Sequence, residues 1–370
     1  MKISLKLFFF PLAFLPFLWD YYIFGLKFFD IVAILIGLFC LIFISKEQIR
    51  EKSPSRIYLF LYFFTFFSII GFINYFDFKG FSGLMLGILY FYLMILFFEK
   101  EDIKKQSFYI LTILLFTFFI QFLSTIFFSE PINFHRIVGD SPRLETAVGF
   151  RTSGLFLEPT SYCAMMFMTL VLRFLLNSFT KYEFFGVLSI PLSFSLYGVF
   201  LFIILIGYWA LKKFRKRFLF SIGVIFIVPI IFLFTQGSNF ASEGTQIYQI
   251  FERLNSISSD ISVVSRYSGS QESNSLVSII FGNGLSTVGG SRLGNFGLGY
   301  LISGVGIFGL IILIVIYMDL FRKKLFYVFS SFFVILLSSY YWTFLVFWMW
   351  MAWIYIILKN SSYYSTNAQK

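Results

Sequence analysis

The stretch Gly149–Ala164 reads GFRTSGLFLEPTSYCA and joins a polar segment to a long apolar run. Pro159 suits the first turn of a helix, because the N–H group that proline lacks would have no partner at that position. We therefore predict a helix that begins at Pro159 and continues through Cys163–Leu176. The N-terminus of such a helix exposes free N–H groups and the positive end of the helix dipole, and both favour a bound anion.

Two charged residues precede this predicted helix start, Arg151 upstream and Glu158 directly before the proline. Both are expected at the boundary between membrane and water. Ionisable residues in membrane segments are frequently functional, although some serve only as anchors near the interface. Two interpretations therefore stay open at this point, a functional site and a membrane boundary with incidental charges.

Composition places the whole chain among membrane proteins. Of its 370 residues, 59% are hydrophobic and only 13% are charged, which is far from the composition of soluble globular domains. The net charge of +11 indicates anchoring on the cytoplasmic side and not a nucleic-acid partner. Met1–Leu18 has a basic start and an apolar run without a small-residue cleavage site, so we interpret it as a retained first helix.

Apolar runs of membrane-spanning length predict an all-α polytopic protein, with one integral membrane domain over residues 1–370. A further run, Leu325–Leu358, is too long for one span and is expected to break near Ser338–Thr343 into two helices. The polar tail Asn360–Lys370 is expected to be disordered. Eight runs are predicted as single spans, namely Leu7–Phe24, Phe28–Ile44, Ile57–Ile73, Phe81–Phe98, Phe108–Phe128, Pro159–Leu176, Phe218–Thr235 and Phe296–Met318.

The distribution of positive charge decides how Phe184–Leu211 crosses the membrane. The basic loops Lys46–Arg56 and Glu99–Lys105 are expected in the cytoplasm. Counting on from these loops, a single pass through Phe184–Leu211 would put the basic cluster Lys212–Arg217 outside. Two short passes keep the cluster inside, with a turn near Ser193–Gly198. The alternative is one tilted helix combined with an error elsewhere in the count.

A turn between two short passes would lie within the membrane. Irregular backbone at that depth is tolerated only where it is buried in protein or lines a water-filled cavity. We therefore predict a cavity that is open to the outside, with Ser193, Ser195 and Tyr197 near its floor. The complete prediction is about twelve transmembrane helices with both termini in the cytoplasm.

Two large outer segments, Ser129–Arg151 and Gln236–Asn295, contain arginine but no lysine, whereas the whole chain has 17 Lys and 12 Arg. The positive-inside rule treats the two residue types alike, so it does not explain this asymmetry. A guanidinium group binds phosphate oxygens in a bidentate manner and keeps its charge in a partly dry site. The arginines therefore suit a lipid-linked diphosphate. These candidate ligands are Arg136, Arg143, Arg151, Arg253, Arg266 and Arg292, with His135 beside them.

The sequence lacks the motifs that several kinds of chemistry require. The single histidine excludes a multi-histidine metal cluster, and no paired carboxylates with metal-ligand spacing occur. No Walker-type loop is present, so ATP is not expected as an energy source. We therefore expect neither a metal nor a cofactor. A sugar diphosphate needs neither, because the bond between its sugar and its phosphate is already activated.

Three stretches resemble the O-antigen (Wzy-type) polymerases. The first stretch resembles the family at eight positions, namely Arg151, Ser153, Gly154, Phe156, Glu158, Pro159, Thr160 and Tyr162. In the second, a large late outer loop carrying Arg253 and Arg266 is followed by Phe281-Gly282-Asn283-Gly284. In the third, the sequence GVGIFG of Gly304–Gly309 lies inside the next predicted helix. The resemblance covers most of the chain in the arrangement of predicted spans and loops, but only these stretches in residue identity.

The resemblance implies a GT-C-like glycosyltransferase of the bacterial cytoplasmic membrane that acts on undecaprenyl-diphosphate-linked glycan. Arginine charge, chiefly that of Arg151 and Arg266, would stabilise the diphosphate that develops in the reaction, and Glu158 would orient or deprotonate the attacking hydroxyl. The helix N-terminus stabilises an ionised carboxylate and so makes it a weaker base, and Glu158 pairing with Arg151 is therefore the alternative. Substrate contacts are expected from Tyr162 and from the polar turn at Ser195 and Tyr197. Membrane lipid, a chain-length regulator and a flippase are the other expected partners.

Two rival functions stay open. O-antigen ligases have a similar layout but usually carry a His-Asn pair at the helix after the large loop, where this chain reads Leu293-Gly294-Asn295-Phe296. A flippase for lipid-linked oligosaccharides should show balanced halves and polar groups along its membrane path. This chain instead concentrates its polar residues in one outer loop.

Overall fold

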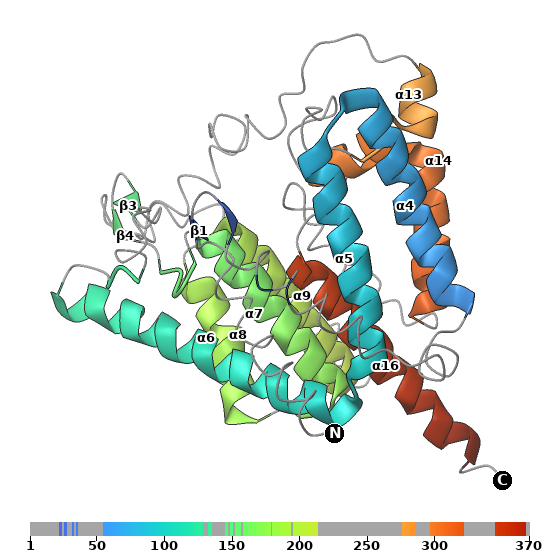
Figure 1. Cartoon of the computed structure of the whole chain (residues 1–370). Coiled ribbons are helices and arrows are strands. Elements are labelled where there is room, and N and C mark those ends of the chain that lie inside the picture. Colours follow the sequence, from blue (N-terminus) through green and yellow to red (C-terminus); the bar gives the residue numbers. More distant parts are fainter. Residues whose placement is uncertain are drawn as a thin grey trace. The chain divides into compact units, whose positions relative to one another are not determined.

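The computed structural model describes the residues 22–23, 26–27, 32, 35, 55–128, 132–134, 145–146, 149–150, 152–156, 158–178, 180–193, 195–213, 276–285, 297–321 and 345–367 (Figure 1). Helices dominate these residues, which confirms the predicted all-α class for this part of the chain. Four of the helices are long and apolar enough to cross a membrane by length and composition, namely Ile57–Tyr75, Phe78–Phe97, Lys100–Phe128 and Gly299–Leu320. The described part of the chain thus has the make-up of a multi-pass membrane protein.

The chain divides into two compact units. The first unit consists of Met1–Phe108, Leu172–Ser178 and Ser265–Lys370, and the second of Tyr109–Val171 and Phe179–Val264. Helices α6 (Lys100–Phe128) and α7 (Pro159–Leu175) each contribute residues to both units.

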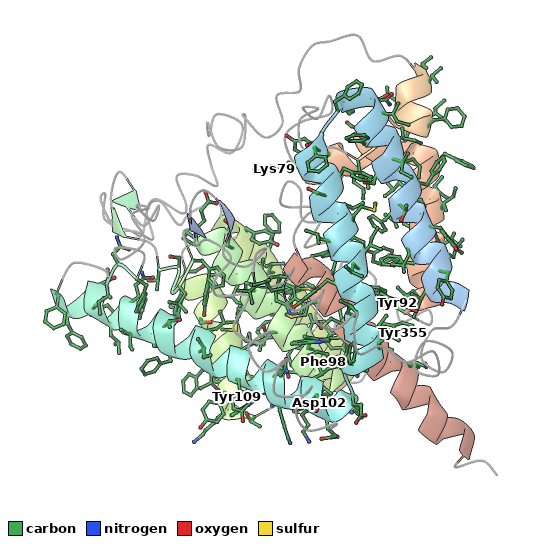
Figure 2. The ribbon with its side chains drawn as sticks, in the orientation of Figure 1. Lys79, Tyr92, Phe98, Asp102, Tyr109 and Tyr355 are labelled. Atoms are coloured by element: carbon green, nitrogen blue, oxygen red, sulfur yellow. The ribbon has the colours of Figure 1, made fainter. Side chains whose placement is uncertain are left out.

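In the first unit, α5 (Phe78–Phe97) packs against both α4 (Ser55–Tyr75) and α16 (Leu345–Asn367). Aromatic rings fill this contact (Figure 2). The ring of Trp348 on α16 lies 5.0 Å from that of Phe64 and 6.0 Å from that of Phe91. A side chain at Gly87 would collide with the Trp348 indole nitrogen, so the glycine lets α5 and α16 approach closely. The phenylalanine-rich composition is therefore used here as packed, edge-to-face core.

The first unit also contains a broken helix. Helix α14 (Gly297–Leu320) packs against α4 and the short α13 (Leu276–Phe281), and it has a non-helical residue at Gly306 with φ 72° and ψ 172°. The sequence GVGIFG therefore lies inside a helix, as expected, but it interrupts that helix. Such a residue breaks the regular pattern of backbone hydrogen bonds and frees nearby carbonyl groups for other partners.

In the second unit, α8 (Lys181–Leu192) and α9 (Leu196–Lys213) pack against each other and are joined by a short turn. This confirms that Phe184–Leu211 is a pair of helices and not one long helix. At about 1.5 Å per residue, α8 rises only about 18 Å, which is less than the ~30 Å hydrocarbon core. Thr180 and Glu183 form a capping box at the start of α8 and fix where it begins.

The pair of helices leads to an expectation about topology. A cysteine placed at Lys213, where α9 ends, should resist a membrane-impermeant maleimide added to intact cells, because the positive-inside rule keeps the cluster Lys212–Arg217 in the cytoplasm. The same cysteine should react after the membrane is permeabilised. Labelling in intact cells would show that the basic cluster lies outside.

Helix α6 begins earlier than the sequence predicted. The segment Glu99–Lys105 was expected as a loop, but the helix starts at Lys100 (Figure 2). The Asp102 carboxylate accepts a hydrogen bond from the Glu99 N–H at 3.2 Å, and acidic residues in a first turn favour helix formation. Buried Arg173 also donates to the Lys104 carbonyl at 3.1 Å. These contacts stabilise a helical start that the charged composition of the segment did not suggest.

Two other boundaries also differ from the prediction. Tyr22–Ile23 pairs antiparallel with Leu26–Lys27, so Tyr22 and Ile23 within the predicted span Leu7–Phe24 form a strand and not a helix. Only Phe24 and Gly25 separate these strands in sequence, and a two-residue connection with glycine favours such pairing. The tail was expected to be disordered, but α16 continues to Asn367, since neither proline nor glycine interrupts it.

A second short antiparallel pair joins Glu145–Thr146 to Gly149–Phe150, directly before the motif that opens α7. Where the structure describes the other predicted spans, its helices lie close to the predicted bounds. Helix α7 begins at Pro159 as expected. Of the predicted span Phe28–Ile44, the structure describes only Val32 and Leu35, and both are helical. The predicted span Phe218–Thr235 and the break at Ser338–Thr343 lie outside the described residues. The twelve-span count therefore stays a prediction.

Candidate functional site

The turn Thr152–Phe156 is held by one amide side chain of α6. The backbone N–H groups of Ser153 and Gly154 both donate to Oε1 of Gln121, at 2.7 and 2.8 Å. Gly154 has a φ of 60°, which favours glycine, and a side chain there would press on Thr117. The turn is therefore fixed to α6 through its own backbone.

Further hydrogen bonds close the turn. The Ser153 hydroxyl donates to the Phe156 carbonyl at 2.6 Å, and the Phe156 N–H donates back to the Ser153 carbonyl at 3.2 Å. The Gln121 Nε2 group donates to the Ile132 carbonyl at 2.9 Å. Thr152 and Ser153 are both buried. The serine and glycine of the motif thus have a structural role, which is to build a rigid turn before α7.

Glu158 lies at the start of α7 and is partly exposed. Its carbonyl accepts hydrogen bonds from the N–H groups of Ser161 and Tyr162, and its carboxylate accepts one from the Thr160 hydroxyl at 3.1 Å. A carboxylate in this position is stabilised by the positive end of the helix. Glu158 can therefore present an oriented acceptor to a ligand hydroxyl.

Tyr162 was predicted as a substrate-binding residue, and the structure places its side chain in the interior of the second unit. Its ring stacks on Phe118 with a centroid distance of 4.7 Å and an angle of 18°. Its hydroxyl donates to Ser189 on α8 at 2.6 Å, and Ser189 donates to the Gly186 carbonyl at 2.8 Å. The tyrosine therefore joins α6, α7 and α8.

The turn between α8 and α9 is buried against α7. The Ser193 hydroxyl donates to the Ile190 carbonyl at 2.7 Å and lies 3.0 Å from the Cys163 sulfur. Ser195 opens α9, because its carbonyl accepts from the Val199 N–H at 3.0 Å. Ser195 and Tyr197 are both buried. Burial in protein is one of the two ways in which irregular backbone survives at membrane depth, and the predicted water-filled cavity stays a prediction.

Gln121 was missed by the sequence analysis. It is the one side-chain amide within the largely apolar run Phe108–Phe128, and a polar side chain inside a membrane helix usually bonds to another segment. That composition could have marked it as a partner residue. The sequence could not have indicated Ser153 and Gly154 as its partners, because they lie more than 30 positions away.

The other predicted ligands lie outside the described residues, namely His135, Arg136, Arg143, Arg151, Arg253, Arg266 and Arg292. Because one diphosphate needs its ligands together, we predict that Arg151, Arg253 and Arg266 converge on one outer cavity. Among the residues that the structure describes, no group of three or more His, Cys, Asp or Glu side chains could hold a metal ion. Neither a scan of protein-family models nor a search of curated proteins finds a match to this chain.

Replacing Gln121 by leucine should destabilise the protein by about 2–6 kcal/mol, because two buried N–H groups each lose an acceptor worth about 1–3 kcal/mol. Gln121→Glu is the comparison variant, since a carboxylate keeps the acceptor for the two N–H groups but loses the donor to Ile132 and brings a charge into a buried site. Thermal unfolding of the purified protein in detergent would measure both. Equal melting temperatures for wild type and Gln121→Leu would contradict the anchoring role.

Proposed function

We propose that this chain is a GT-C-like polysaccharide polymerase with about twelve spans, which acts at the outer face of the bacterial cytoplasmic membrane. Its two substrates are undecaprenyl-diphosphate-linked glycans. A hydroxyl of the terminal sugar on one glycan attacks the first sugar of the other. A new glycosidic bond forms, the bond from that first sugar to diphosphate breaks, and the proton and undecaprenyl diphosphate leave. The product is a glycan that is longer by one repeat unit.

The observation that carries this proposal is the hydrogen bonding of Ser153 and Gly154 to Gln121. A membrane boundary with incidental charges would need no such turn. Reactive groups need a rigid support to hold their geometry, and this turn lies in sequence between Arg151 and Glu158. The resemblance to O-antigen polymerases rests on these same residues, so a built turn at this place supports the polymerase over the boundary interpretation.

The proposed roles follow from the chemistry of each group. Arg151, Arg253 and Arg266 bind the donor diphosphate and stabilise its growing charge in the transition state. Glu158 accepts the hydrogen bond of the attacking hydroxyl and orients it, with Thr160 and the helix N-terminus holding the carboxylate in place. Tyr162 acts through packing, because its hydroxyl is bonded to Ser189.

Deleting the gene and analysing the surface polysaccharide tests the proposal against its two rivals. Loss of a polymerase should leave single repeat units attached to the surface acceptor. Loss of a ligase should leave long glycan on undecaprenyl diphosphate and none on the acceptor. Loss of a flippase should leave single lipid-linked units on the cytoplasmic side. Either of the last two results would reject the polymerase.

A further inference from the structure

Helix α13 presents an exposed apolar surface. Leu276 and Val277 are 76% and 66% exposed, and Phe281 is 59% exposed. The ring of Phe281 lies 6.3 Å from that of Phe308 on α14. Phe308 and Ile311 are exposed on a helix that is long and apolar enough to span a membrane. The exposed face of α13 therefore continues directly onto the exposed face of a candidate membrane span.

The residues after α13 are held between α4 and α14 through their backbone. The N–H groups of Asn283 and Gly284 donate to the carbonyls of Ser303 and Gly304, at 2.9 and 2.8 Å, and Leu285 N–H donates to the Phe67 carbonyl at 2.9 Å. On the α14 side, the acceptors lie just before the helix break, where regular helical hydrogen bonding stops. Three consecutive N–H groups of an extended segment are thus satisfied without water.

Glycines make this close contact possible on all three segments. A side chain at Gly284 would collide with the Gly71 nitrogen on α4, and one at Gly282 would collide with the Gly304 carbonyl on α14. Gly282 and Gly284 have φ values of 79° and 90°, which favour glycine. The sequence FGNG therefore fits between two helices at backbone contact distance.

Contacts along α4 place this segment relative to the end of that helix. Phe67, whose carbonyl bonds to Leu285, lies eight residues before the end of α4 at Tyr75, which is about 12 Å along the helix. The Asn283 carbonyl accepts a hydrogen bond from Nδ2 of Asn74, one residue before that end, at 2.8 Å. Phe67 and Ser303 both fall inside candidate membrane spans. The segment therefore runs inward from the end of α4, and Leu285 lies within the apolar length of that helix.

We propose that Leu276–Leu285 is a re-entrant membrane segment, in which α13 contacts the acyl chains of the bilayer and the extended part is sealed between α4 and α14. Non-helical backbone survives at membrane depth only where its polar groups are satisfied by protein, and the three hydrogen bonds meet this condition. The apolar face of α13 is then covered by lipid, because it continues onto the lipid-facing side of α14. The outer segment predicted for 236–295 accordingly re-enters the membrane at its end. This proposal is independent of the reaction that the protein catalyses.

The test places an environment-sensitive NBD fluorophore on Val277→Cys in the full chain, with Cys40→Ser as background and the native Cys163 left buried. The protein is reconstituted into vesicles of phosphatidylethanolamine and phosphatidylglycerol. We expect quenching by doxyl-labelled lipid and loss of quenching by aqueous iodide. Asn274→Cys, three positions earlier in the polar stretch of the sequence, is the matched control and should show the reverse. Equal iodide quenching at both positions would overturn the proposal, as would protection of Val277→Cys from both quenchers, which would indicate a covering protein.

A second variant tests the seal itself. Gly284→Ala should release the segment and restore iodide quenching at Val277→Cys, because the new methyl group meets the Gly71 nitrogen. Gly207→Ala is the control, since a side chain there meets nothing within 4 Å. Unchanged protection in a folded Gly284→Ala protein would overturn the role of the seal. Should that variant fail to fold, the comparison of Val277→Cys with Asn274→Cys decides the proposal alone.

Discussion

Arg151→Lys should abolish most long-chain polysaccharide while the protein still inserts into the membrane at normal levels. Lysine keeps the positive charge but loses the planar fork that binds two phosphate oxygens at once. A donor that contributes mainly in the transition state is worth about 2.7–4 kcal/mol, or about a hundredfold to a thousandfold in rate. The expected loss is therefore far larger than a mere change of membrane anchor would cause.

The surface polysaccharide ladder of a complemented deletion strain measures this effect. Single-repeat products from Arg151→Lys, with normal membrane levels of the protein, would support polymerisation over ligation, because a dead ligase leaves no attached repeat. Arg173→Lys is a useful comparison, since Arg173 donates to carbonyls of the protein itself and is expected to change stability more than activity. A full-length ladder from Arg151→Lys would assign that residue to the membrane boundary.

Gly306→Ala should prevent recovery of folded protein. With φ 72° and ψ 172°, the residue occupies a region that is essentially restricted to glycine, where other residues cost about 1–3 kcal/mol. The added methyl group would also collide with the Ile280 carbonyl. Relieving that collision moves α13 away and breaks the bonds to Ser303 and Gly304, each of which costs about 1–3 kcal/mol when buried groups lose their partners. The summed cost of the backbone strain and the lost hydrogen bonds approaches the whole free energy of unfolding of many proteins, about 5–15 kcal/mol.

Yield and monodispersity after detergent extraction, followed by thermal unfolding, would measure the consequence. Gly207→Ala is again the matched control. Gly207 is an exposed position on α9 with open space around it, and alanine in a helix interior is about 1 kcal/mol more favourable than glycine. This control should therefore be neutral or slightly stabilising. A Gly306→Ala protein that melts at the wild-type temperature would show that the helix break is not required.

Local residue properties were sufficient to predict several elements. Pro159 marks the start of α7 because a helix tolerates proline in its first turn. The break between α8 and α9 followed from charge, because one long helix would have carried Lys212–Arg217 to the wrong side. Both inferences succeeded because the physical cause lies in the residues of the segment itself or in a count along the chain.

Local properties misjudged boundaries where a distant partner decides the outcome. The segment Glu99–Lys105 was predicted as a loop, but Arg173 bonds to the carbonyl of Lys104, 69 positions away, within the helix that begins there. Tyr162 was predicted as a substrate contact, and the structure adds that its hydroxyl is bonded to Ser189 and its ring stacks on Phe118. In each case the deciding contact joins segments whose proximity no local pattern encodes.

The sequence alone determined that this is a helical membrane protein, because apolar runs of spanning length can satisfy their backbone only as helices. It also placed Arg151 and Glu158 before the start of one helix. Only the tertiary structure decided that Gln121 holds the intervening turn, and that Gly71, Gly284 and Gly306 meet around an extended segment. The physical reason is that a glycine in an apolar run permits close backbone contact and an amide permits a hydrogen bond, but neither indicates its partner. The partner is set by packing between segments that are remote in the chain.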